Sequence, residues 1–446
     1  MSSISFKTAE LEDLATQLER IIKPQKTTTI PEKEILLLKE KIDLMEHSDE
    51  VLLIKAKLLE HYAQQKHSNP ILEQAISTYH EILISPQVSD DLFKEAGDRC
   101  VKLMKFRGWN GKAIRVLQIL VQRFNDDLSY RKKLGVTFLS MNDNKAAYKV
   151  FDAILQKDPN DYYAQAHFGF IVKSEALEEN DDKKLEKAVK LIEYGILNQP
   201  SNEQLDGLFY FHLADGFRRL GLPEKADEIY HLAVQRKIFP SFWQRSLYNE
   251  PDLKAQPIWT LEETGIGPQL KRIQTRWKDI RNEALAVLDS KTGGFINETE
   301  NLKDTGYWAQ FDLYIQGRKR TQNCAKTPIT CSLIDSIPEI KSNRRGQVKF
   351  SVMKSGTHIH PHSGPTNCRL RAHLGLDIPK SDPKVSKLRV GDQYLSWSNG
   401  DLFVFDDSFD HEVWFENEMN ASRMILIIDL WHPDLSEQQR QTLTSI

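Results

Sequence analysis

Long hydrophobic runs are missing from this chain of 446 residues. A membrane-spanning helix needs about 18 or more consecutive apolar residues, and the sequence contains no such run. The first ten residues, MSSISFKTAE, also lack the apolar core of a signal peptide. We therefore expect a chain that has no signal or transmembrane segment and makes no membrane contact of its own.

An excess of charge of one sign is missing as well. The chain has 60 basic and 63 acidic side chains, which gives a net charge of −3. This balance provides no general attraction to nucleic acid or to anionic lipid. The apolar fraction of 40% is too high for a mostly disordered chain. The length predicts two or three folded domains, and no nucleic-acid partner is expected.

Cysteine is scarce, and four residues are too few for a disulfide scaffold. Cys324 and Cys331 lie close together in the loop-like stretch CAKTPITC. From the residues alone, both a local disulfide and two free thiols are open, because loop cysteines pair only in an oxidising compartment.

The first half of the chain has helical spacing of its apolar residues, from about residue 31 to 237. The pair Leu134-Gly135 recurs 34 residues later as Phe168-Gly169, and this is the period of tetratricopeptide repeats. Small residues at these positions let paired helices approach closely. We predict a tetratricopeptide-type helical solenoid over 31–240, after a flexible segment over 1–30; an ordinary helical bundle is the alternative. The charged segment 178–184 is expected to be an exposed loop within it.

The pattern changes after Phe239-Pro240. One amphipathic helix is expected from about 270 to 290, and period-2 apolar patterns follow it. The predicted strands cover 347–353, 368–378, 401–405 and 424–431. Residues 241–446 are therefore expected to form a β domain.

Histidines are concentrated near the end of this β domain. Six of the 13 lie near its end: His358, His360, His362, His373, His411 and His432. His362 lies in a strand-end loop and His411 just beyond another strand, so two imidazoles could meet at one metal ion. The carboxylate that usually completes a facial triad with these ligands would stand at position 364, where this sequence has glycine.

Two arginines accompany the histidines. In the alternating strand RLRAHLGLDI, Arg371 and His373 share one face, and Arg423 lies at the start of the last strand. Burying arginine without an anion is costly, so this arrangement predicts an anionic ligand inside the barrel. Together, these residues are typical of a non-haem Fe(II) oxygenase that uses an oxo-acid co-substrate.

Two other interpretations of these residues remain open. Strand alternation places His358, His360 and His362 on the same side, so the three could bind a structural zinc ion, although such sites usually include cysteine. Asp406, Asp407 and Asp410 crowd the approach to His411. One of them could be a metal ligand, but a turn with solvated carboxylates is the favoured interpretation.

Several long motifs resemble the aspartyl/asparaginyl β-hydroxylase family. They are GTHIHPHSGPTNCRLRAHLGL, FDDSFDHEVW and IIDLWHPDLSEQQR, and the resemblance extends back through NLKDTGYWAQFDLYIQGR, WQRSLYN and LKAQPIWT into the helical repeats. It implies a double-stranded β-helix (jelly-roll) oxygenase domain behind tetratricopeptide repeats. It also implies β-carbon hydroxylation of Asp or Asn in epidermal-growth-factor-like domains, with Fe(II), 2-oxoglutarate and O₂. In that family a glycine replaces the third iron ligand, which agrees with Gly364.

The resemblance also implies individual roles, listed here in this chain's numbers. The iron ligands would be His362 and His411. The co-substrate would be bound by Ser351, Arg371, His373 and Arg423. The protein substrate would be contacted by Trp308, Gln310, Tyr248 and Lys303, the last of which stands where the family usually has arginine. The family also has a local disulfide that matches Cys324 and Cys331.

The resemblance implies a location in the endoplasmic reticulum lumen, behind an N-terminal membrane anchor that this sequence does not contain. Membrane contact is therefore expected only through such an anchor. A catalytically inactive, repeat-based protein-binding scaffold is the alternative function.

Overall fold

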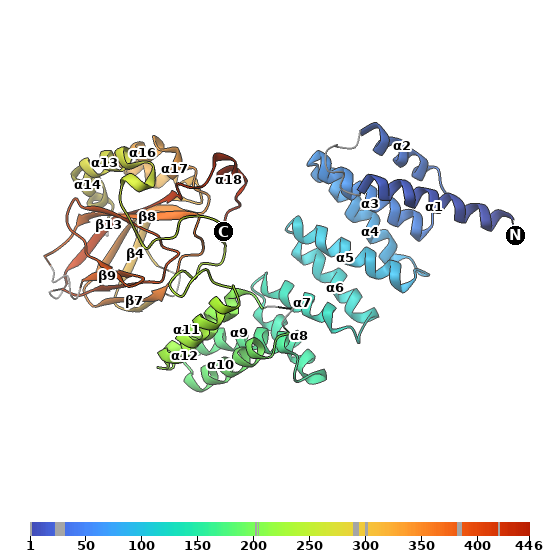
Figure 1. Ribbon diagram of the computed structural model, residues 1–446, viewed down its shortest axis with the longest axis horizontal. Helices are drawn as coiled ribbons and strands as arrows, with labels where there is room; N and C mark the ends of the chain where they lie inside the picture. The colour runs from blue at the N-terminus through green and yellow to red at the C-terminus, as the bar shows by residue number, and fades with distance from the viewer. Residues whose placement is uncertain are drawn as a thin grey trace. The chain divides into compact units, whose positions relative to one another are not determined.

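The computed structural model describes residues 2–22, 32–200, 203, 205–288, 294–298, 302–380, 386–417 and 420–446. The chain divides into two compact units (Figure 1). The first consists of Met1–Leu205 with Gly216–Gly221, and the second of Asp206–Asp215 with Leu222–Ile446. The domain limits expected at residues 30 and 240 stay predictions. None of the helices in the described ranges is long and apolar enough to span a bilayer.

The first unit is built from helices, each of which packs against the next along the chain (Figure 1). They are α1 (Ser2–Ile22), α2 (Glu32–Asp43), α3 (Asp49–Lys66), α4 (Asn69–Ile84), α5 (Asp90–Phe106), α6 (Asn110–Arg123), α7 (Leu128–Leu139), α8 (Asn144–Lys157), α9 (Tyr162–Glu179) and α10 (Asp182–Leu197). Two more helices follow along the chain: α11 (Gly207–Arg219), which is divided between the two units, and α12 (Pro223–Gln235), which belongs to the second. The predicted stack of helical hairpins is confirmed.

The small residues of the repeat lie where helices approach each other closely. A Cβ atom added at Gly135 would lie 2.7 Å from the ring of Phe151, and one at Gly169 would lie 2.8 Å from Ile192. Aspartate caps the starts of α7 to α10: Asp161, for example, accepts a hydrogen bond from the backbone N–H of Ala164 at 2.8 Å. The repeat pattern read from the sequence therefore has a direct packing basis.

Helix α1 lies within the segment 1–30, where Leu14, Leu18 and Ile21 form an apolar stripe that is buried with residues of α2 and α3. The flexibility expected of this segment stays a prediction. The charged segment 178–184 is largely exposed, as expected, but the expectation of a loop is wrong for most of it, because α9 extends to Glu179 and α10 begins at Asp182.

The second unit contains two antiparallel sheets. The larger has the order β1-β11-β8-β13-β6-β4-β2, with β5 paired to β4, and the smaller has the order β10-β9-β12-β7-β3. The strands are β1 (Ile258–Trp259), β2 (Ile296–Asn297), β3 (Lys303–Thr305), β4 (Trp308–Ile315), β5 (Arg318–Lys319), β6 (Gln347–Lys354), β7 (Thr357–His362), β8 (Arg369–Asp377), β9 (Lys387–Val390), β10 (Gln393–Leu395), β11 (Leu402–Phe405), β12 (His411–Phe415) and β13 (Ser422–Trp431).

From β6 onward the chain alternates between the two sheets: β6, β8, β11 and β13 lie in the larger, and β7, β9, β10 and β12 in the smaller. This alternation defines a double-stranded β-helix and confirms the predicted jelly roll. The four strands predicted from the sequence correspond to β6, β8, β11 and β13.

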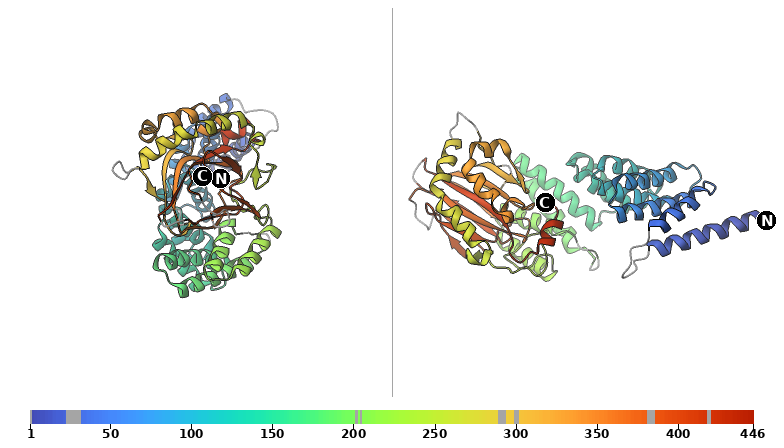
Figure 2. Two further views of the ribbon diagram at one scale, coloured as in Figure 1. Left: turned by 90° about the vertical axis from the view of Figure 1, so that its left-hand side faces the viewer. Right: turned by 90° about the horizontal axis from the view of Figure 1, so that it is seen from above.

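Short helices cover the outer face of the larger sheet (Figures 1 and 2). They are η1 (Glu262–Thr264), α13 (Gly267–Thr275), α14 (Trp277–Leu288), α15 (Thr321–Lys326), α16 (Pro328–Asp335) and α17 (Pro338–Lys341), and α18 (Glu437–Thr442) lies near the C-terminus. The single helix expected over 270–290 is therefore two helices, which meet at Arg276.

Strand β8 has the alternation that the sequence predicts. Leu370, Ala372, Leu374 and Leu376 are fully buried in the core that includes α13, α14 and α16. Arg371 and His373 therefore point to the opposite face, which looks toward the smaller sheet.

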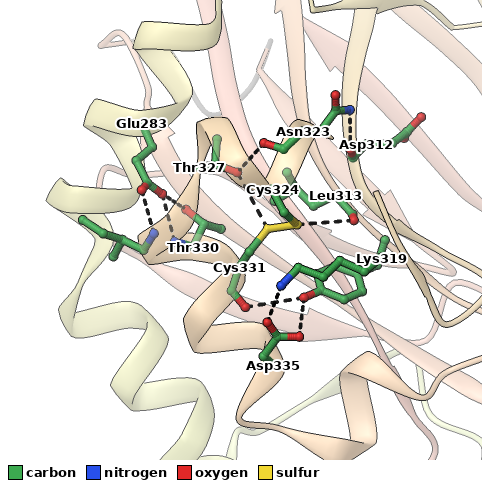
Figure 3. The surroundings of a disulfide bond; sticks show 12 residues. Glu283, Asp312, Leu313, Lys319, Asn323, Cys324, Thr327, Thr330, Cys331 and Asp335 are labelled. Atoms are coloured by element: carbon green, nitrogen blue, oxygen red, sulfur yellow. Dashed lines mark hydrogen bonds and ion pairs between the residues drawn. A yellow bond between two sulfur atoms is a disulfide. The ribbon is translucent and has the colours of Figure 1, made fainter. Parts of the chain in front are cut away.

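A disulfide joins Cys324 in α15 to Cys331 in α16, as the resemblance implied (Figure 3). Next to it, the carboxylate of Glu283 in α14 accepts hydrogen bonds from the backbone N–H groups of Ile329 and Thr330, at 2.7 and 2.9 Å. The first turn of α16 is thus held by a carboxylate at one side and by the disulfide at the other.

Candidate active site

His362 and His411 lie directly opposite each other on the neighbouring strands β7 and β12, and their ring centroids are 4.1 Å apart. Nδ1 of His362 is 2.8 Å from the carbonyl oxygen of His360, and Nδ1 of His411 is 2.9 Å from that of Phe409. A carbonyl oxygen only accepts, so each Nδ1 has the hydrogen and each Nε2 has the lone pair. This is the tautomer in which imidazole binds a metal ion.

His411 is held in its neutral form. Its side chain is buried, and this burial lowers its pKa well below the usual value, with a further contribution from the nearby ring of His362. Metal binding requires the unprotonated imidazole. Because burial in the fold already favours this form of His411, a metal ion need not displace a proton from it. Two imidazoles oriented toward one position fit a transition-metal ion.

A β-bulge separates His362 from the other two histidines of β7. Val413 pairs with Ile359 but His411 pairs with His362, so β7 advances three residues while β12 advances two. The extra residue turns His362 to the same side as His411, whereas His358 pairs with Trp414. The expectation that His358, His360 and His362 share one side is therefore wrong.

Arg423 is a buried cation that forms no ion pair with any described residue. Its side chain is 1% exposed, and its guanidinium carbon lies 4.0 Å from the ring centroid of Trp397. Its Nη2 lies 3.1 Å from the sulfur of Met353, while Nε and Nη1 have no hydrogen-bond partner within the described ranges. Burial lowers the pKa of Arg423 to about 9. Two unmet donors on a buried cation are what a carboxylate ligand would satisfy.

Ser351 and His373 flank the strand that holds Arg423. Ser351 pairs with Ile425, two residues from Arg423 along β13, and its hydroxyl accepts a hydrogen bond from the indole of Trp308 at 3.0 Å. Burial lowers the pKa of His373 well below its usual value, and the positive charge of Arg423 adds to this. Its Nε2 is a further buried atom without a described hydrogen-bond partner.

Arg371 differs from Arg423 because protein carboxylates already neutralise it. Its Nε donates to Asp429 at 2.7 Å, and its Nη1 lies 3.3 Å from Asp407. The expectation of a buried arginine that needs an anionic ligand is therefore wrong for Arg371, while the contacts of Arg423 agree with it.

The aspartates before His411 are buried, so the expected turn with solvated carboxylates is wrong. Asp407 is fully buried and lies 2.6 Å from Nη2 of Arg369. Burial alone would raise its pKa, but Arg369 and Arg371 outweigh burial and hold the pKa below its usual range. Asp410 forms ion pairs with Arg245 and, at 2.8 Å, with Arg389.

The structure also explains the glycine at position 364. The N–H of Gly364 donates to the carbonyl of Asp407 at 2.5 Å, and a Cβ atom at position 364 would overlap the Asp407 carboxylate. A carboxylate side chain therefore has no room at position 364, and the carboxylate next to it belongs to Asp407.

A cavity of about 410 Å³ opens at the histidine pair. It is lined by both histidines and, among others, by Gly364, Arg371 and Asp407. Arg423, Ser351 and His373 do not line it, and they lie between the two sheets. The histidine pair is thus an accessible candidate metal site, and Arg423 is a separate, buried cationic group.

The predicted substrate residues fall into two groups. Trp308 and Gln310 lie on β4, and Gln310 accepts a hydrogen bond from Lys349. Tyr248 and Lys303 are exposed and lie on other segments. The backbone N–H of Tyr248 donates to Pro365, which lines the cavity at the histidine pair, and Lys303 pairs with Ile359 on β7.

The sequence analysis missed Lys349. This lysine is 2% exposed, and its Nζ lies 3.2 Å from the carboxylate of Glu298 and 5.8 Å from the ring centroid of Trp308. The sequence could have indicated it, because Lys349 lies two residues before Ser351 on the same strand and alternate residues of a strand share a face.

Comparison with known proteins finds the family that the sequence motifs resemble. Residues 274–433 match the model of the family described as aspartyl/asparaginyl beta-hydroxylase. The chain is 43% identical over 393 residues to the aspartyl/asparaginyl beta-hydroxylase of Homo sapiens, covering 88% of this chain and 50% of that protein. The corresponding protein of Mus musculus is 42% identical, with 88% and 51% covered. The chain therefore spans about half the length of these relatives.

A third relative, aspartate beta-hydroxylase domain-containing protein 2 of Mus musculus, is 33% identical over 46% of this chain and 60% of its own length. Among solved structures, a tetratricopeptide repeat protein from Parabacteroides merdae has 15% identity and a TM-score of 0.36, covering 51% of this chain and 79% of that one. Residues 274–433, which form most of the β domain, therefore match the aspartyl/asparaginyl β-hydroxylase family.

Proposed function

We propose that this chain is an Fe(II)- and 2-oxoglutarate-dependent hydroxylase that acts on the β-carbon of Asp or Asn in epidermal-growth-factor-like domains. The observation that supports it most is the buried, unneutralised Arg423 together with the oriented pair His362 and His411. A dicarboxylic co-substrate could place one carboxylate near a metal ion and the other on this arginine.

In this proposal, Nε2 of His362 and Nε2 of His411 hold Fe(II). Arg423 and Ser351 bind the distal carboxylate of 2-oxoglutarate, and His373 presents its second ring nitrogen to the co-substrate. When bound, Fe(II), 2-oxoglutarate and O₂ supply the oxidising power that converts a C–H bond to C–OH, with succinate and CO₂ as coproducts. Having only two protein ligands leaves more positions for co-substrate and O₂ than a triad would.

The chain's own residues prepare the site before any ligand arrives. Two backbone carbonyls fix the histidine tautomers. Asp407 places a negative charge close to His411. Its carboxylate is held by an ion pair with Arg369. Arg371, held by Asp429 and Asp407, lines the cavity and remains a proposed co-substrate contact. Trp308, Gln310, Tyr248 and Lys303 remain proposed substrate contacts.

The test is direct incubation of the protein with Fe(II), 2-oxoglutarate, ascorbate and a folded epidermal-growth-factor-like peptide. Mass spectrometry should find a gain of one oxygen on a single Asp or Asn. His362→Ala should abolish the product, while His80→Ala, at an exposed position of the helical unit, should leave it unchanged. No product with the unaltered chain, or an undiminished product with His362→Ala, would refute the assignment and favour a binding scaffold.

We also propose a location in the endoplasmic reticulum lumen. The Cys324–Cys331 disulfide supports it, because such bonds persist in oxidising compartments. Measuring the free thiols of the protein isolated from its native host tests this. Four thiols per chain would contradict it, and two would support it.

A further inference from the structure

A second group of potential metal ligands lies on the smaller sheet, away from the histidine pair. Asp304 on β3 and His358 and His360 on β7 place one ligand atom each within 4.8 Å of one another. The two strands are direct neighbours, since Thr305 pairs with His358. The side chains are 25 to 44% exposed, so a hydrated ion can reach them.

The distances suit a small transition-metal ion. One oxygen of Asp304 is 2.9 Å from Nδ1 of His358, and the other is 3.5 Å from Nε2 of His360. Ligand atoms around tetrahedral Zn²⁺, each about 2.0–2.1 Å from the metal, are about 3.4 Å apart. Small rotations of three side chains would therefore complete the site without moving the backbone.

The second ring nitrogen of His358 already has a partner that such a site requires. Its Nε2 lies 2.9 Å from the carboxylate of Glu412 on β12, and Glu412 is held in turn by Arg389 at 3.1 Å. Metal-binding histidines commonly donate their other N–H to a carboxylate, which fixes the tautomer and raises ligand basicity. With Glu412 accepting from Nε2–H, a metal ion that displaces the Nδ1 proton would meet the lone pair of His358 on the side of Asp304.

We propose that Asp304, His358 and His360 bind one divalent transition-metal ion of the Zn²⁺ type, with water completing the coordination. Two imidazoles and one carboxylate favour such ions over Ca²⁺ and Mg²⁺, which prefer oxygen ligands alone. This site is separate from the histidine pair, because the bulge in β7 turns His362 to the other face. It does not depend on the proposed hydroxylase function.

Metal binding there would tie the short strand β3 to β7. Lys303, a proposed substrate contact, is the neighbour of Asp304 on that strand. The ion would thus fix the position of Lys303 relative to β7. Without an ion, His358 bridges Asp304 and Glu412 as a protonated ion pair, and this is the alternative that the experiment must exclude.

The experiment measures Zn²⁺ uptake by the full, untagged chain after removal of the histidine pair. The variant His362→Ala/His411→Ala retains the second group of ligands and should bind one Zn²⁺ in equilibrium dialysis with elemental analysis. Adding His360→Ala should weaken binding at least about 10-fold, and adding His80→Ala should not. Glu412→Gln should weaken it about 10- to 100-fold, as expected for an outer partner.

Asp304→Asn provides a second arm, because Asp304 is exposed and its replacement leaves the core intact. Circular dichroism confirms that each variant is folded. Co²⁺ should give the visible absorption of a four-coordinate site in the starting variant and lose it with Asp304→Asn. If the His362→Ala/His411→Ala chain takes up no Zn²⁺, or if neither His360→Ala nor Asp304→Asn weakens uptake, the proposal is wrong.

Discussion

The carboxylate of Asp407 occupies the space that a side chain at Gly364 would need. This carboxylate is fully buried, is paired with Arg369, and lies close enough to His411 to affect its pKa. Position 364, where a facial triad has its acidic ligand, therefore has no room for a side chain. A carboxylate is still present near the histidine pair, but it comes from the loop between β11 and β12.

Gly364→Ala should destabilise the folded chain by about 1–3 kcal/mol, because the added methyl group overlaps Asp407 in a tightly packed region. Urea denaturation measures this. Gly111→Ala is the matched control, since a Cβ atom there meets nothing within 4 Å and alanine favours its helix. Equal stabilities for the two variants would contradict the crowding that we describe.

Arg423→Met and Arg371→Met should change stability in opposite directions. Removing the unneutralised charge of Arg423 should stabilise the ligand-free chain by about 1–2 kcal/mol, while 2-oxoglutarate binding, measured calorimetrically, should be lost. Removing Arg371 should cost about 1.5–3 kcal/mol, because Asp407 and Asp429 lose one of their two cationic partners and keep Arg369. A loss of stability with Arg423→Met would show that this arginine has a partner in the ligand-free protein.

The stability of the chain should contain a pH-dependent contribution from Asp406. Burial raises the pKa of its carboxyl to about 8, against 3.8 in the unfolded chain, and one of its oxygens has no described hydrogen-bond partner. Between these values the folded state retains a proton that the unfolded state has released. This contribution is therefore fully present below about pH 4 and is lost as the pH rises toward 8.

Asp406→Asn tests that contribution, because the amide keeps the shape and cannot ionise. Its stability relative to the unaltered chain should improve from pH 5 to 8, by at most about 1.4 kcal/mol per pH unit. Guanidinium denaturation at several pH values provides the comparison. Parallel stability curves for the two proteins would mean that Asp406 is already ionised in the fold.

The disulfide should contribute about 2 kcal/mol to stability, since it closes a short loop with a sequence separation of 7. Cys324→Ser/Cys331→Ser should lower the free energy of unfolding, measured by urea denaturation, by that amount. Reductant should lower the midpoint of the unaltered chain to a similar extent and leave the double variant unchanged. A reductant effect on the double variant would indicate a different thiol.

Local sequence patterns were enough to predict several features of this protein. The 34-residue recurrence of Leu134-Gly135 predicted close helix packing, which Gly135 and Phe151 provide. The alternation along β8 placed Arg371 and His373 on one face because side chains in a strand alternate regardless of context. The long motifs around His362 and His411 indicated the family. Each of these features depends on neighbours within a few residues or on a repeat period.

Other features were decided by residues far apart in the chain. A bulge opposite Glu412 turned His362 away from His358 and His360, and only the pairing of β7 with β12 defines it. Asp407 and Asp429 neutralise Arg371, while Arg423 meets Trp397 and Met353, although both arginines look alike in the sequence. Whether a charge is paired depends on which distant strands fold against it, and that is why the tertiary structure alone distinguished the two arginines.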